Sequence, residues 1–135
     1  MLSRFDDYPI HQTPEPIAHR ATSDPNAYDR YWFNGIDRDA RFYFGAALGL
    51  YPHQQVMDAH FSMLVDGEQH ALHASRLAPR EPSETRVGPL TLEVLEPMRR
   101  LRLAIAPNPT GIEAELLFVS RAPALEEARA RMKAG

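Results

Sequence analysis

Two histidines and an aspartate near the middle of the chain are the residues whose types and spacing could do chemistry. Asp58, His60 and His73 lie in the segment QVMDAHFSMLVDGEQHALHASR, which runs from Gln55 to Arg76. A carboxylate beside an imidazole can act as a general acid–base pair, because imidazole titrates near neutral pH. The alternative is a partly exposed polar group between strands, satisfied by its neighbours and without a catalytic role.

These side chains meet only if the segment folds as a hairpin. Apolar and polar residues alternate on both sides of Asp66-Gly67, as is typical of strands with one buried face. An Asp-Gly pair is a strong signal for a two-residue turn, because both residues tolerate a positive φ. Such a turn places His60 opposite His73 and Asp58 opposite Ser75, whereas a three-residue loop would shift this pairing.

Histidine side chains can also bind a metal ion, and the same segment contains three of them. His70 lies three residues before His73, so the two side chains point to opposite faces of a regular strand. His60, His70 and His73 therefore converge only if the strand contains a bulge. The chain also has no glycine-rich phosphate loop, nucleophile elbow or zinc-binding helix motif. We predict no metal site and no cofactor.

Aromatic residues in two further segments could line a cavity for an apolar ligand, although they could equally form an ordinary core. Tyr28–Asn34 and Arg41–Tyr51 have the alternation and the aromatic content of strands. One face of the second segment carries small residues between two tyrosines, which indicates a curved strand or a ligand groove. Barrel mouths commonly bind small molecules with such side chains. The candidate ligand-binding residues are Trp32, Tyr31, Tyr43, Phe44 and Tyr51.

The rest of the chain continues the β pattern. Alternation returns in three later segments: Thr85–Glu96, Arg99–Ala106 and Ile112–Ser120. About seven short strands in sequential order predict an antiparallel barrel or sandwich. In the last hairpin, the simplest register places Arg102 opposite Glu115, which would be a stabilising pair of opposite charges.

The two ends of the chain differ from this β-rich middle. Residues 1–27 contain four prolines and several apolar residues, which predicts an extended arm that packs across a surface. Residues 122–135 contain Pro123, which suits a first helical turn, and acidic residues precede basic ones, which predicts a short helix. We therefore expect an arm over 1–27, an antiparallel β domain over 28–121 and a C-terminal helix over 122–135.

Composition excludes several function classes. The chain has 135 residues, a net charge of −3 with mixed signs and no cysteine. This length suits one domain, and this net charge does not indicate nucleic-acid binding. The first residues lack the apolar run of a signal peptide, and no apolar stretch approaches the roughly 18 residues of a membrane span. We expect a cytoplasmic protein.

Three segments carry a family resemblance: Phe5–Asp39, which begins FDDYPIHQ, Val56–Arg76 and Arg86–Leu103. They resemble the first half of a bacterial family of uncharacterised proteins related to AttH-like and hydroxyneurosporene-synthase-like (carotenoid hydratase) proteins. The resemblance covers most of residues 4–127. It implies two lipocalin-like β-barrel domains in tandem, hydrophobic or isoprenoid-like ligands and, for the carotenoid enzymes, cofactor-free hydration by acid catalysis. No catalytic motif of that group maps onto this chain.

The residues and the resemblance together predict a mostly β protein, a lipocalin-like barrel or half-barrel that binds a hydrophobic small molecule in its cavity. One alternative is a hydratase or isomerase with His60 and Asp58 as acid and base, next to His73. Another is a structural or assembly module. The family's chains are longer, and a missing second barrel would expose an apolar face. A homodimer is the simplest way to cover such a face.

Overall fold

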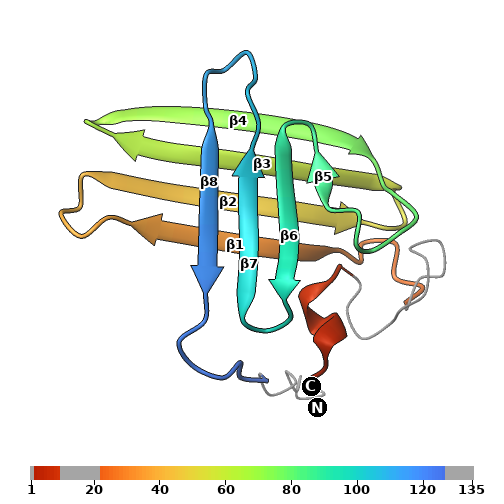
Figure 1. Ribbon diagram of the computed structural model, residues 1–135. Helices are drawn as coiled ribbons and strands as arrows, with labels where there is room; N and C mark the ends of the chain where they lie inside the picture. Colours follow the sequence, from red (N-terminus) through yellow and green to blue (C-terminus); the bar gives the residue numbers. More distant parts are fainter. Residues whose placement is uncertain (1, 10–21, 127–135) are drawn as a thin grey trace, which may run out of the picture.

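The computed structural model describes residues 2–9 and 22–126, which form two antiparallel four-stranded sheets. The first sheet contains, in spatial order, β1 (Asp29–Ile36), β2 (Phe42–Tyr51), β3 (Val56–Val65) and β4 (Glu68–Leu77). The second contains β5 (Arg86–Val87), β6 (Leu90–Glu96), β7 (Arg100–Ile105) and β8 (Ala114–Val119). The sheets face each other, and the strands of the second run crosswise over those of the first (Figure 1).

The core lies between the two sheets because alternate residues of each strand are apolar. The inward side chains of β2 and β3 are almost fully buried, and those of β6 and β7 meet them from the other side. Burial of one such side chain contributes about 1.5–3 kcal/mol. The largest fully buried side chains are Phe61, Leu48, Leu50, Met57, Leu90, Leu92, Leu103 and Val87.

The central hairpin has the predicted register. Asp66 and Gly67 adopt φ values of 50° and 82°, which a two-residue turn of this kind requires. Consequently His60 pairs with His73, and Asp58 lies opposite Ser75.

The prediction of one strand over Thr85–Glu96 is wrong, because a turn at Gly88 and Pro89 divides it into β5 and β6. Gly88 has a φ of 58°, and a Cβ atom there would lie 2.9 Å from the Cβ of Ala74. The turn therefore needs glycine, both for its conformation and for its contact with β4. The described residues contain eight strands rather than about seven.

The predicted register of the last hairpin is also wrong, by two residues. Glu115 lies opposite Ala104, and Arg102 lies opposite Leu117. The loop between the strands is longer than expected. Arg102 still contacts Glu115 diagonally, with Nε 3.2 Å from Oε1, and its Nη1 lies 2.8 Å from Glu93 on β6. Long side chains reach such diagonal partners across a ladder.

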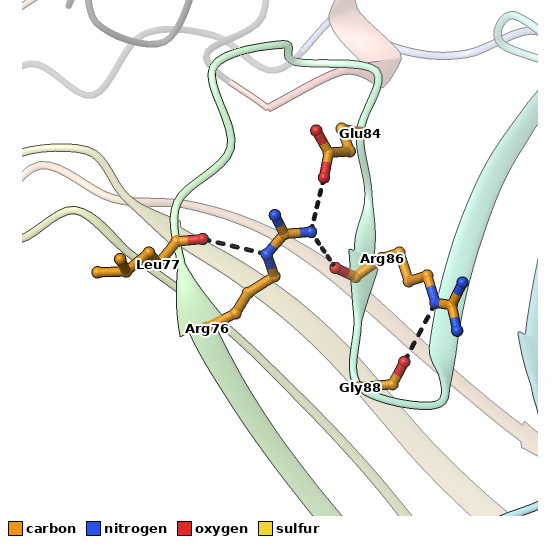
Figure 2. Close-up of polar contacts among 5 residues, drawn as sticks. All are labelled: Arg76, Leu77, Glu84, Arg86 and Gly88. Atoms are coloured by element: carbon orange, nitrogen blue, oxygen red, sulfur yellow. Dashed lines mark hydrogen bonds and ion pairs between the residues drawn. The ribbon is translucent and has the colours of Figure 1, made fainter.

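A mostly β, antiparallel fold is confirmed, but a closed lipocalin-like barrel is not: among the described residues no strand pairs across the two sheets. At the corner between β4 and β5, a side chain makes the connection instead (Figure 2). Arg76 Nη1 donates to the carbonyl of Arg86 on β5 at 3.1 Å and lies 2.7 Å from Glu84 Oε1. Its Nε donates to the carbonyl of Leu77.

The ends of the chain are described only in part. Arg4–Asp7 forms a 3-10 helix, η1, that is hydrogen-bonded to β1 and to the β6–β7 turn: the Tyr31 hydroxyl donates to the carbonyl of Asp7, and the Asp7 carboxylate accepts from the Met98 amide. Residues 123–126 are not helical, and the rest of the predicted C-terminal helix lies outside the described residues. Within the described ranges, no helix has the length and apolar character needed to cross a bilayer.

Candidate functional site

The side of the β1–β4 sheet that faces away from the second sheet is termed the outer face. Strand register arranges its side chains in rows that cross all four strands. One row, termed the His row, consists of Trp32, Ala47, His60 and His73. The adjacent row, termed the Asp row, consists of Arg30, Gly49, Asp58 and Ser75.

Aromatic rings lie next to one another along the His row. The Trp32 and His60 ring centroids are 5.8 Å apart, and those of His60 and His73 are also 5.8 Å apart. Between Trp32 and His60 lies only Ala47, whose small side chain lets the rings on both sides approach each other. Trp32 nevertheless remains 55% exposed, so the row presents an indole and two imidazoles to solvent.

The environment of His60 favours its neutral form. Partial burial lowers the pKa of His60 below its ordinary value of 6.5, and the neighbouring His73 lowers it further, while Asp58 opposes the shift. Burial penalises the charged imidazolium, and a second imidazolium beside it would repel it. At neutral pH His60 therefore offers one N–H donor and one acceptor nitrogen.

The Asp row is shaped by a close approach to the backbone of β2. A Cβ atom on Gly49 would lie 2.8 Å from Asp58 Oδ1 and 3.2 Å from the Tyr51 ring. Glycine is therefore required for these two side chains to lie over β2. Tyr51 also stacks on Tyr28, and its hydroxyl accepts from Arg30 at 3.4 Å. The small residues of β2 thus accommodate neighbouring side chains rather than form an empty groove.

An open depression of about 400 Å³ lies on the outer face between β3 and β4. Its polar side chains are those of Asp58, His60, His73 and Ser75. The structure therefore brings together the three predicted catalytic residues, with Ser75 beside them. Their donors and acceptors can bind a small polar group, and Trp32 provides an apolar surface at the neighbouring end of the His row.

The five predicted ligand-binding residues do not lie together. Trp32, Tyr43 and Tyr51 belong to the outer face, whereas Phe44 is buried in the core and stacks on Phe61. Tyr31 also points inward, and burial raises the pKa of its phenol. Because successive residues of a strand point to opposite faces of the sheet, these five residues are divided between the two faces. The buried hydrophobic residues fill the interior between the sheets.

The part of the chain described here shows no group of three or more His, Asp or Glu side chains that could hold a metal ion. His70 lies on the face opposite His73 and close to Glu68, with Nε2 3.9 Å from Oε2. A second depression of about 370 Å³ lies where Tyr8 meets β5, β6 and the preceding loop. It has no histidine in its lining.

One residue of the site was missed from the sequence. Arg30 occupies the same face as Trp32, two residues before it, and adds a cationic group to the Asp row. The alternation of β1 predicts that shared face, but it does not predict that β3 brings Asp58 into the same row. Only the register between β2 and β3 does so.

Comparisons with known proteins place the chain in a family. No curated protein and no solved structure matches it. One family model matches residues 2–135, nearly the full chain, and that family is described as DUF8625, a family of unknown function. Because the match extends through both sheets, it includes all of the outer face. The chain therefore belongs to the DUF8625 family of unknown function.

Proposed function

We propose that the protein binds a hydrophobic small molecule on the outer face of the β1–β4 sheet, with the polar end of the molecule in the depression at His60 and His73. The observation that carries this proposal is the His row. It presents a half-exposed indole beside two imidazoles on a sheet face that no other described element covers.

The distribution of exposed apolar side chains supports the proposal. Of the large apolar residues that are exposed, six belong to the outer face of this one sheet or its edge: Tyr28, Trp32, Ile36, Tyr43, Leu64 and Leu77. Scattered apolar residues are ordinary on a protein surface, but a concentration of them on one face marks a site of interaction. The site is thus an open face rather than the barrel cavity expected from the sequence.

The geometry favours binding over acid catalysis. A hydratase that protonates a double bond needs a protonated acid, whereas burial and His73 keep His60 neutral at pH 7. No hydrogen bond is formed between His60 and Asp58 among the described contacts, so an acid–base dyad is not assembled. We therefore assign these groups to recognition of the ligand's polar end.

Two arguments suggest the class of ligand: the exposed aromatic side chains and the family resemblance. Trp32 and Tyr43 offer flat apolar surfaces, which suit unsaturated or ring-containing molecules. The resemblance to AttH-like and carotenoid-hydratase-like proteins points in the same direction, to isoprenoid-like compounds. We accordingly propose an isoprenoid- or lipid-like ligand bound without a cofactor.

Trp32 allows a direct test, because it is the one tryptophan in the sequence. Titration with β-ionone, a short isoprenoid ketone, is expected to change Trp32 emission saturably. Calorimetry of the same titration gives an affinity that does not depend on fluorescence. Absence of both signals, with β-ionone and with a fatty acid, would reject the proposal.

Matched variants locate the binding. His60→Ala and His73→Ala are expected to weaken binding about five- to tenfold, since each removes a hydrogen-bonding group worth about 1–1.5 kcal/mol. His70→Ala is the control, because His70 lies on the same strand as His73 but on the opposite face. Equal effects of His70→Ala and His73→Ala would place the site elsewhere.

A further inference from the structure

We infer that the outer face also binds a second copy of the chain, around a two-fold axis that runs along β2, and that the partner completes the ligand depression. The face contains the exposed apolar residues described above, and within the described residues no element covers it. A two-fold dimer uses the same patch on both copies, so the patch must be complementary to itself.

The order of the strands provides that complementarity. A two-fold axis along β2 places β1 of one copy over β3 of the other, because these strands flank β2 on its two sides. In each row the β1 residue then faces the β3 residue of the partner. Ile36, which is 65% exposed, faces the partner's Leu64, which is 46% exposed, and Trp32 faces the partner's His60.

The charged residues of the outer face are also complementary under this two-fold rotation. Arg30 on β1 and Asp58 on β3 belong to one row, with Gly49 of β2 between them. Rotation about β2 therefore places Arg30 of each copy over the partner's Asp58, so that two pairs of opposite charge form. Complementary charges of this kind fix the register of an interface and disfavour other arrangements.

Side chains that cover the axis would form the contact. Gly45, Ala47 and Gly49 are the outward residues in the middle of β2, but Trp32 and His60 flank Ala47, and Asp58 and Tyr51 lie over Gly49, so the partner meets these side chains rather than the β2 backbone. Tyr43 and Tyr51 lie at the two ends of this small-residue segment, and each faces the same residue of the partner copy. Strands β1–β3 have a footprint of roughly 450 Å² from standard strand spacing. Projecting side chains increase this area toward the roughly 800 Å² per partner of a standard interface.

The dimer changes the ligand site. β1 is an edge strand, so no partner strand lies over β4, and the depression between β3 and β4 stays open at the rim of the interface. On each copy the partner would cover Trp32 and Tyr43. The ligand in the dimer would therefore contact the partner's Trp32 and the partner's Arg30, which form the wall beside the depression. This second part of the inference depends on the proposed ligand site, whereas the dimer itself does not.

Sedimentation velocity at micromolar concentration, without ligand, tests the dimer. The wild type is expected to sediment as a dimer. Arg30→Asp and Asp58→Arg, each alone, are expected to weaken self-association at least tenfold, because like charges then face each other twice. An equimolar mixture of the two variants restores opposite charges at both contacts, so it is expected to form a heterodimer.

Tyr43→Arg supplies a second test, because it places two cations against each other on the axis. Its control is Leu117→Arg, at a residue of similar exposure (52%) on the other sheet. Circular dichroism checks that each variant is folded. A monomeric wild type, no recovery in the mixture, or equal effects of Tyr43→Arg and Leu117→Arg would overturn the dimer. Binding of β-ionone by a monomer would leave the proposed function in place.

Discussion

His60 lies between an indole and a second imidazole, and its protonation state determines what the His row can bind. A neutral imidazole can stack beside Trp32 and still donate one hydrogen bond, whereas an imidazolium would introduce charge into an apolar surface. The groups that influence its charge are His73, Asp58 and Arg30. Recognition of an uncharged ligand is therefore expected to be strongest where His60 is neutral.

This expectation can be measured by NMR titration of the His60 ring protons. We predict a midpoint below 6.5, and a midpoint closer to 6.5 in His73→Gln, because removal of His73 leaves only burial and Arg30 to lower the pKa, against the opposing effect of Asp58. The unfolded chain then binds more protons than the folded one at acidic pH. The stability contributed by neutral His60 is therefore complete above pH 6.5 and is lost as pH falls through the folded-state pKa. A midpoint above 6.5 would contradict this account.

At the same scale, the sequence predicts the pairing of His60 with His73 but not its surroundings. The Asp-Gly turn determines the register of β3 and β4 by local chemistry, so residues on these strands could be placed from the sequence. Trp32 and Arg30 reach the site through β2, whose pairing depends on packing of the whole sheet. That information is not local, so the sequence alone did not place them.

The alternation along a strand determines which face an aromatic side chain points to. Two glycines of β1 and β2 show how closely these side chains pack. A Cβ atom on Gly35 of β1 would lie 2.4 Å from the Phe44 ring on β2. A Cβ atom on Gly45 would have its nearest neighbours, Ser62 Oγ and the Trp32 ring, at 3.7 and 3.9 Å. The two glycines lie on neighbouring strands, Gly35 opposite Phe44 and Gly45 opposite Asn34, and they face opposite sides of the sheet, so they have different roles.

We predict that Gly35→Ala lowers the free energy of unfolding by about 1–3 kcal/mol, because the Phe44 ring must move within the packed core. Gly45→Ala is the matched control. It is expected to change stability by less than about 1 kcal/mol, in the stabilising direction, because glycine is a poor strand residue. Urea denaturation measures both. Equal destabilisation by the two substitutions would show that the fit against Phe44 is not the cause.

Arg76 permits a test of the corner where the two sheets meet. Arg76→Met keeps an unbranched apolar stem but removes the guanidinium, and with it the bonds to Glu84 and to the carbonyls of Arg86 and Leu77. The side chain is partly exposed, so we expect a loss of only about 1 kcal/mol of stability, with faster hydrogen exchange in β5. Arg41→Met removes the more exposed pairs with Asp37 and Asp39 and should have a smaller effect. Unchanged exchange in β5 would contradict a joining role for Arg76.

The whole molecule has one filled core between two sheets, and no described element covers the outer face of the β1–β4 sheet. The sequence predicts the antiparallel β class, because alternation and turn residues are local signals. It leaves a barrel and a sandwich open, because closure depends on whether edge strands such as β4 and β5 pair, and here a side chain joins β4 to β5 instead. For that reason the proposed ligand site is an open sheet face, whereas the sequence predicts a barrel cavity.

The most direct test of the central claim is two-dimensional NMR of the labelled chain during addition of β-ionone. We predict saturable shifts of the amides around Ala47, His60 and His73, with little change around Leu117 on the second sheet. The same spectra of His60→Ala should show smaller shifts at equal ligand concentration. No shifts at all, or shifts centred on the depression beside Tyr8, would contradict the assignment of the outer face as the binding site.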